Sequence, residues 1–435
     1  MSLHRWSSSA ERQQFYQSLE VAVTLMVTSS FLEEDDNNDF SLLFFMHALS
    51  LRDIILAPIV DSTIDWQRDP LLVRDISDHD CLHYFRFRKS HLQFVCDLLW
   101  PRIFPFLKIH QKSNLILCQY GYTCPYDTSM LMVLFRLARP VRLRPEMEKY
   151  FHTRKSKISA ILHTFIRALF QVCFPYFISP DIWHSRMPYY AELIAEKSNN
   201  AVTTTWSFID GTLRKTCRPV RFQRQAYSGH KRHHGIKFQS LVVPEGLIAC
   251  LFGPVAGHRH DSYMLSESGI IHKVRQLMPE DGSNGPIYQI YGDPAYPMNA
   301  HLFGGFRNPP EGSPEAEWNT QMSKVREVVE WMFKEIPQKF AYLNFKNSMK
   351  IFKEPIALYY FIGAFLINIH TTIYKNQTTM YLGCTLHHTL SVRQYLELRS
   401  VHEIVAINIA HGVSFHDNMN EDFMEHFGDI NVIDN

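Results

Sequence analysis

Two aspartates of the chain each follow a short apolar segment and precede a residue typical of turns. Asp210 comes after residues 202–209 and before Gly211, and Asp293 comes before Pro294. Carboxylate oxygens are the ligands that Mg²⁺ and Mn²⁺ prefer in proteins. Two such ions can activate a water or hydroxyl nucleophile and stabilise the departing 3′ oxygen of a phosphodiester. The two acids are therefore candidates for metal-dependent phosphodiester chemistry, although Asp-Gly and Asp-Pro are also ordinary turn dipeptides.

A third candidate acid, Glu330, lies in a segment with helical periodicity. Apolar residues recur at helical spacing through residues 323–336, which predicts a helix with one buried face. Glu330 and Arg326 are one turn apart on another face, so Glu330 could instead serve only as the ion-pair partner of Arg326. Glu327 is the competing candidate for the acid on this helix.

Strand-like segments surround the two aspartates. Residues 202–209, 237–243, 247–252 and 287–291 are rich in β-branched and aromatic residues, and residues 244–246 read Pro-Glu-Gly, which predicts a hairpin turn. Acids at the ends of adjacent strands would meet at one edge of a sheet. The pattern of strands followed by a helix predicts a mixed α/β domain.

Seven sequence blocks in this region resemble, in their order, the DDE endonuclease domain of PIF/Harbinger-type transposases and their domesticated nuclease relatives. The resemblance covers about residues 201–369. The blocks are Phe208-Ile209-Asp210-Gly211-Thr212, Arg218-Pro219, residues 225–234, residues 237–246, residues 257–262, residues 292–296 and residues 326–333.

The resemblance implies an RNase H-like mixed sheet with flanking helices over residues 200–375. It also implies that Asp210, Asp293 and Glu330 are catalytic and hold Mg²⁺ or Mn²⁺, with Asp261 as a further metal ligand. The chain departs from the family pattern after Asp293, where Pro-Ala replaces the usual Ser-Gly, and at Lys334, where a glycine is usual. Neither departure removes a candidate ligand, but both indicate drift around the helix of Glu330, as in a copy no longer selected for transposition.

The region before this domain is predicted to be helical. Residues 1–126 show apolar clusters broken by turns and carry no recognisable chemistry, whereas residues 127–175 predict three helices that resemble a helix-turn-helix. We expect the third helix to begin at Thr153 as its N-cap. Cations in a first helical turn oppose the helix dipole, so they indicate a recognition helix facing DNA, or else a solvated surface turn. These cations are Arg154, Lys155 and Lys157.

Charge is distributed unevenly although the net charge is only +1. Residues 211–244 hold eight Lys and Arg and no acid, whereas residues 400–435 hold seven acids and no Lys or Arg. The first segment predicts a surface for polyanions such as DNA, with a solvated loop as the alternative, and residues 376–435 are predicted to be an acidic tail. The residues that we expect to contact DNA phosphates here are Arg218, Arg221, Arg224, Lys231, Arg232 and Lys237.

Other catalytic classes find little support in the sequence. His260-Asp261 also begins the metal site of HD phosphohydrolases, but those enzymes have an all-helical core and this dipeptide lies beside strands. His230, His233 and His234 lack the cysteine partners of a typical zinc site. Phosphate-binding GxxxxGK, GxSxG and HExxH motifs do not occur, which argues against ATPases, serine hydrolases and zincins.

Composition is that of a folded globular chain with about two or three domains in 435 residues, 46% of which are hydrophobic. Its eight cysteines show no CxxC pair, which favours a reducing compartment. We find no secretory signal pattern near the N-terminus, and we interpret the apolar residues 355–369 as a buried core helix rather than a membrane span.

The sequence therefore leads to two functional hypotheses. The first is a metal-dependent DNA nuclease or transposase in the nucleus, or in both nucleus and cytoplasm, assisted by the Myb-like DNA-binding partner that the resemblance implies. The second is a DNA-binding adaptor that keeps the fold but has lost cleavage. The presence of all three acids favours the first hypothesis.

Overall fold

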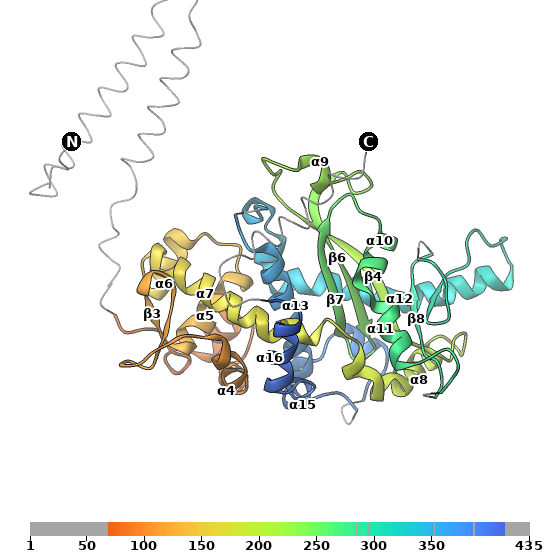
Figure 1. Cartoon of the computed structure of the whole chain (residues 1–435), viewed down its shortest axis with the longest axis horizontal. Helices are drawn as coiled ribbons and strands as arrows, with labels where there is room; N and C mark the ends of the chain where they lie inside the picture. The colour runs from red at the N-terminus through yellow and green to blue at the C-terminus, as the bar shows by residue number, and fades with distance from the viewer. Residues whose placement is uncertain (1–67, 284, 295, 352, 386–387, 414–435) are drawn as a thin grey trace, which may run out of the picture. The chain divides into compact units, whose positions relative to one another are not determined.

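A mixed β-sheet lies at the centre of the computed structural model, which describes residues 68–413 except 284, 295, 352, 386 and 387 (Figure 1). These residues belong to the second of the two units into which the chain divides, Trp66–Asn435. The strands lie in the order β7, β6, β4, β8, β9, and the short β5 also pairs with β6. Their bounds are β4 (Thr205–Lys215), β5 (Tyr227–Ser228), β6 (His233–Val243), β7 (Leu247–Ala256), β8 (Gln289–Gly292) and β9 (Leu302–Gly304).

The strand directions divide the sheet into two parts. β6 runs antiparallel to its neighbours β4 and β7, whereas β8 and β9 run parallel to β4. This combination of order and direction is compatible with the RNase H-like mixed sheet that the sequence predicts.

Local sequence determines the hairpin between β6 and β7 as predicted. Gly246 has a φ of +72°, which side chains other than glycine rarely adopt, and a Cβ there would lie 2.1 Å from the Asn376 amide oxygen. The Asn376 amide donates a hydrogen bond to the carbonyl of Gly246. The turn is thereby fixed both by its own glycine and by a residue far along the chain.

Two long helices flank the sheet. Helix α12 (Pro314–Lys339) packs against β4 and β6, and α13 (Ile356–Tyr374) packs against β7. α12 begins earlier than residue 323, where the sequence analysis began its helix, because Ser313 caps the Ala316 amide and Pro314 occupies the first helical position. α13 is almost entirely buried, which confirms the interpretation of residues 355–369 as a core helix.

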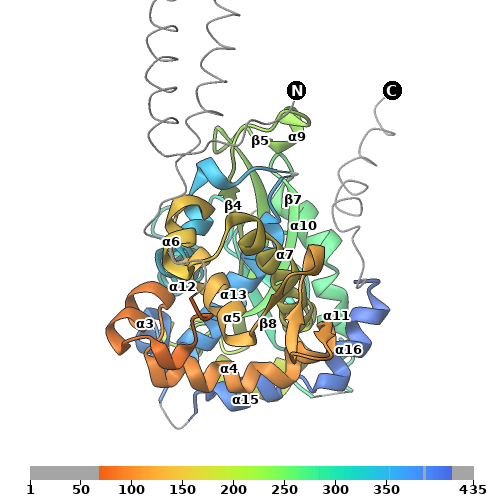
Figure 2. The ribbon, with the colours of Figure 1, turned by 90° about the vertical axis from the view of Figure 1, so that its left-hand side faces the viewer.

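The N-terminal helices of this unit lie together on the side of the sheet that carries α13, as both views show (Figures 1 and 2). They are α3 (Asp78–Phe85), α4 (Lys89–Ile103), α5 (Tyr126–Ala138), α6 (Glu148–Phe151) and α7 (Lys155–Cys173). Between α4 and α5 the chain forms a small antiparallel sheet that the sequence analysis missed, because strands of two or three residues show no alternation. Its strands are β1 (Ile109–His110), β2 (Leu115–Leu117) and β3 (Thr123–Cys124).

Residues 376–413, the described part of the predicted acidic tail, form short helices that belong to this unit. Arg399 donates hydrogen bonds to both carboxylate oxygens of Asp181, at 2.7 and 2.6 Å, and so anchors this segment. Six of the seven acids of residues 400–435 come after residue 413 and so lie outside the described residues.

The remaining elements are short connections. The α-helices are α8 (Met187–Lys197), α9 (Gln223–Ala226), α10 (Asp261–Ser268), α11 (Ile270–Leu277), α14 (Gln377–Tyr381), α15 (Val392–Glu397) and α16 (Val401–Ala410). The 3₁₀ turns are Val73–Asp75, Phe104–Phe106, Gln119–Gly121, Phe174–Tyr176, Asp181–Arg186, Ala341–Asn344 and Lys346–Ser348, and Leu143–Met147 is a π turn. Among the described residues, Lys155–Tyr176 and Ile356–Tyr374 are long and apolar enough to cross a membrane, and most of each is buried inside the fold.

Candidate active site

The register of β4 against β8 brings Asp210 and Asp293 to the same level of the sheet. Phe208 of β4 lies opposite Tyr291 of β8 in the parallel pair, and each aspartate comes two residues later. Because side chains alternate along extended chain, Asp210 points to the same side of the sheet as Phe208. The sequence prediction that the two aspartates come together is supported by this register.

The structure corrects one part of that prediction. β4 does not end at Asp210 but continues to Lys215, with Asp210 opposite Ser240 of β6. The Asp-Gly pair is therefore not a turn, because the long antiparallel partner β6 keeps the chain extended past the point where β8 ends. Asp293, in contrast, follows the last residue of β8 as predicted.

Asp261 joins the site from the first residue of α10. A Cβ at Gly211 would lie 2.8 Å from the Asp261 Oδ1 atom, so this carboxylate lies directly against the β4 backbone next to Asp210. Lys237 of β6 donates to the same oxygen at 3.1 Å, and it also donates to the Arg259 carbonyl at 2.7 Å. Lys237, which the sequence analysis assigned to DNA phosphates, is thus ion-paired inside the site.

Helix α12 contributes Arg326 and Glu330. Arg326 Nη1 lies 3.3 Å from Asp210 Oδ2, and its Nη2 lies 3.6 Å from Glu330 Oε1. One guanidinium therefore bridges the acid on the strand and the acid on the helix. Glu327 is exposed on another side of α12, so the structure brings Glu330 rather than Glu327 to the neighbourhood of Asp210.

Burial gives Asp210 an unusual protonation equilibrium. The pKa of its carboxyl is raised from 3.8 to about 6, chiefly by loss of solvent and to a smaller extent by the negative charges of Asp261 and Asp293. Arg326 and the amide of Gly211, which donates to Asp210 Oδ1 at 2.8 Å, act in the opposite direction. The influence of both aspartates on Asp210 indicates that three carboxylates share one region of low solvent exposure.

Tyr296 lies beside these acids and was missed by the sequence analysis. Burial raises the pKa of its phenol well above the ordinary value, and the charges of Asp261, Asp210 and Asp293 contribute to the rise. Its hydroxyl accepts a hydrogen bond from the buried Gln239 amide at 3.1 Å. No local sequence signal marks this tyrosine, because its role depends on the sheet register.

All the acidic side chains of this site offer carboxylate oxygens, the donor set of a hard divalent cation. In the described part of the chain, however, no group of three or more His, Cys, Asp or Glu side chains is close enough to hold a metal ion. Arg326 and Lys237 instead balance the charges of the acids. The residue types fit a divalent ion, and binding one would require these cations to give up their contacts.

The acid-free basic segment, residues 211–244, comprises the end of β4, the connection between β4 and β6, and β6 itself (Figure 1). Arg214 differs from its neighbours because its guanidinium donates to Thr212 and to the Phe333 carbonyl within the fold. Arg218 donates to the Gln223 side chain at 2.9 Å. The predicted phosphate-binding residues that are exposed here are Arg218, Arg221, Arg224, Lys231 and Arg232.

The predicted recognition helix corresponds to α7, but its start differs from the prediction. Arg154 occupies the N-cap position, and the Thr153 hydroxyl bonds to the Phe151 carbonyl instead of capping α7. The carboxylate of Glu148 accepts the Lys155 amide at 2.6 Å and performs the capping role. The remaining turns of α7 are largely buried. Arg154 and Lys155 are exposed and Lys157 is half-buried.

Comparison with known families identifies the region that holds these acids. Residues 209–368 match the family model described as DDE superfamily endonuclease. The match begins one residue before Asp210, ends within α13, and includes Asp261, Asp293 and Glu330. No curated protein and no solved structure matches the chain. The match over residues 209–368 is consistent, at the level of the superfamily, with a Harbinger-type transposase-derived nuclease.

Proposed function

We propose that the chain is a divalent-metal-dependent DNA endonuclease of the transposase type, built on an RNase H-like core. The observation that carries the proposal is the convergence of Asp210, Asp261 and Asp293 at one level of the sheet, with Glu330 linked to Asp210 through Arg326. These acids come from β4, α10, the end of β8 and α12. That arrangement suits the two-ion displacement at a phosphodiester.

Each acid of the site has a stated role in this proposal. Asp210, Asp293 and Glu330 would hold Mg²⁺ or Mn²⁺, with Asp261 as a further ligand. The bound ions would supply an activated nucleophile and stabilisation of the leaving oxygen. Arg326 and Lys237 neutralise Asp210 and Asp261 at 3.3 and 3.1 Å and would be displaced when the ions enter.

DNA binding is assigned to two exposed basic surfaces. The first is the β4–β6 connection with Arg218, Arg221, Arg224, Lys231 and Arg232, which would neutralise phosphates near the site. The second is the start of α7, which would act as the recognition helix of a helix-turn-helix through its exposed first turn. A Myb-like DNA-binding partner and a nuclear location belong to the same proposal.

A second candidate function is a DNA-binding adaptor without cleavage activity. It is favoured by one observation, namely that Arg326 and Lys237 occupy the acids and that the described residues contain no cluster of three metal-binding side chains. In that case the ion pairs would be the permanent state of the site.

A plasmid-nicking assay separates the two functions. Purified full-length chain with Mg²⁺ or Mn²⁺ should nick duplex DNA, and Asp210→Asn and Glu330→Gln should each abolish nicking. Glu327→Gln is the matched control, since Glu327 is an exposed acid on the same helix and should leave nicking unchanged. Retained DNA binding without nicking by the unmodified chain, with either metal and on DNA that includes its own flanking sequence, would establish the adaptor.

A further inference from the structure

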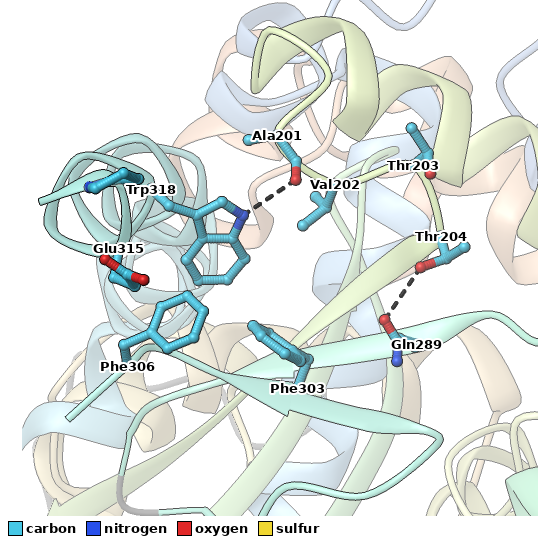
Figure 3. Close-up of a pocket in the computed structure, with 10 residues that line it drawn as sticks. Ala201, Val202, Thr203, Thr204, Gln289, Phe303, Phe306, Glu315 and Trp318 are labelled. Atoms are coloured by element: carbon cyan, nitrogen blue, oxygen red, sulfur yellow. Dashed lines mark hydrogen bonds between the residues drawn. The ribbon is translucent and has the colours of Figure 1, made fainter. Parts of the chain in front are cut away.

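A pocket of about 460 Å³ lies at the other end of β4 and β8 from the carboxylates (Figure 3). Its walls come from residues 201–204 before β4, from Gln289 at the start of β8, from β9 and the residues after it, and from the first turns of α12. Glu315 of this pocket and Glu330 of the acidic site are on the same helix, roughly 22 Å apart along its axis at 1.5 Å per residue. The pocket is therefore separate from the candidate active site.

Three aromatic rings form one side of the pocket and stand at steep angles to one another. The ring centroids of Phe303 and Trp318 are 5.0 Å apart, those of Phe306 and Trp318 are 5.4 Å apart, and those of Phe303 and Phe306 are 6.0 Å apart. The three interplanar angles are between 75° and 79°. The Trp318 indole donates to the Ala201 carbonyl at 3.0 Å, so the ring is held in place without a ligand (Figure 3).

The backbone next to these rings is also fixed. The Asn319 side chain accepts the Phe306 amide at 2.9 Å and donates to the Phe306 carbonyl at 2.9 Å. The amide oxygen and the amide nitrogen of Asn319 on α12 thus both hold the backbone of Phe306 in the loop after β9. A preorganised pocket of this kind loses little conformational entropy on binding.

The charge of the pocket selects the class of ligand. Glu315 is the charged side chain among the described residues that line it, and none of those residues is Lys, Arg or His. The polar side chains of Thr204 and Gln289 bond to each other at 3.1 Å, and Gln289 also donates to the Ala300 carbonyl. Aromatic faces with one carboxylate attract organic cations. A phosphate-bearing ligand would find no cationic partner here.

We propose that this pocket binds a methylated ammonium group, as carried by a methylated lysine side chain of a partner protein. Such a group is poorly hydrated, its positive charge is attracted to the exposed parts of the rings, and it needs no hydrogen-bond acceptor. Glu315 lies beside Trp318 and Phe306 and adds Coulombic attraction (Figure 3). The volume exceeds that of the head group alone, so it also accommodates an alkyl stem.

Calorimetric titration of the full-length chain with choline and with 3,3-dimethyl-1-butanol tests the chemistry. The two probes have nearly the same shape, and only choline carries a charge, so choline should bind at least about tenfold more tightly. Equal affinities would show a merely apolar pocket and overturn the proposal, as would no binding of choline. The N-acetyl methylamide of trimethyl-lysine should bind more tightly than choline and than its unmethylated counterpart. A preference for choline would instead identify a small-molecule ligand and overturn the lysine assignment.

Variants locate the binding in this pocket. Glu315→Gln should weaken trimethyl-lysine binding several-fold, whereas Glu317→Gln, an acid of the same helical turn that does not line the pocket, should leave it unchanged. Phe306→Leu keeps an apolar side chain but removes a ring face, and should also weaken binding. Equal effects of the two glutamate variants would refute the assignment. Nicking by Glu315→Gln should match the unmodified chain, so failure of this proposal is distinct from failure of the nuclease proposal.

Discussion

Replacing Asp210 with asparagine should stabilise the metal-free protein at neutral pH while abolishing metal-dependent cleavage. Only 18% of the Asp210 side chain is exposed, and its carboxylate shares a poorly solvated region with two other acids. Asparagine has nearly the same shape and carries no charge. The substitution therefore removes an unfavourable ionisation from the folded state.

The size of the effect follows from the pKa. The pKa of Asp210 is raised from 3.8 to about 6, and one pKa unit corresponds to about 1.36 kcal/mol, so its ionisation costs the folded state about 3 kcal/mol at neutral pH. Since the folded-state pKa is the higher one, this cost is absent below pH 4, grows as the pH rises from about 4 to 6, and is constant above. The stability difference between variant and unmodified chain should follow the same course.

Urea unfolding in EDTA at several pH values measures this difference, and the matched control is Glu330→Gln. The Glu330 side chain is 46% exposed, so its neutralisation should change the free energy of unfolding by less than about 0.5 kcal/mol. Adding Mg²⁺ should stabilise the unmodified chain and not Asp210→Asn. A variant that is no more stable than the unmodified chain at pH 7 in EDTA would refute the electrostatic reasoning.

Three further predictions concern the same site. Because a proton and a metal ion compete for the Asp210 carboxylate, calorimetric Mn²⁺ affinity should fall as the pH is lowered through about 6, and an affinity that is constant from pH 5 to 8 would contradict this. Arg326→Gln removes the guanidinium that bridges Asp210 and Glu330, so it should destabilise the metal-free chain. It should also tighten Mn²⁺ binding several-fold in calorimetry, because the guanidinium then no longer competes with the metal ion. Weaker Mn²⁺ binding by the variant would contradict this and would show that Arg326 helps to shape the site. Gly211→Ala would place a Cβ 2.8 Å from Asp261 Oδ1 and displace that carboxylate, so it should reduce nicking at least about tenfold. That loss corresponds to a rise of about 1.4 kcal/mol or more in the activation barrier. The control variant Gly229→Ala, with nothing within 4 Å of its added Cβ, should nick DNA normally.

Sequence reasoning succeeded where the signal is local. The Pro-Glu-Gly turn predicts its hairpin because a glycine with positive φ is needed there, and the apolar run around Gly363 predicts a buried helix because nearly every residue is hydrophobic. The position of Asp293 just after β8 was also predicted from local sequence, because a short apolar segment there precedes Asp-Pro. These features depend on a few neighbouring residues.

The errors arose where a partner distant in sequence decides the structure. Asp210-Gly211 reads as a turn, but β6 pairs with β4 as far as Lys215 and keeps the dipeptide extended. The contacts of Lys237 with Asp261 and of Arg326 with Asp210 depend on the register between strands and on the rotation of α12. No periodicity in a single sequence contains that information.

The charge arrangement of the site connects its stability to its proposed chemistry. The two cations Arg326 and Lys237 form ion pairs with three acids of the site, Asp210, Glu330 and Asp261, and neutralise part of their charge. The raised pKa of Asp210 reflects chiefly the loss of solvent around its carboxylate and, to a smaller extent, the repulsion by Asp261 and Asp293. A divalent ion would remove that repulsion and release the cations, so it would stabilise the fold in proportion to its affinity. An adaptor that never bound metal would gain stability by losing one of these acids, because substitutions that relieve such strain are common and readily tolerated. A destabilising aspartate at position 210 is therefore expected if the site binds a metal ion, and not expected of an adaptor.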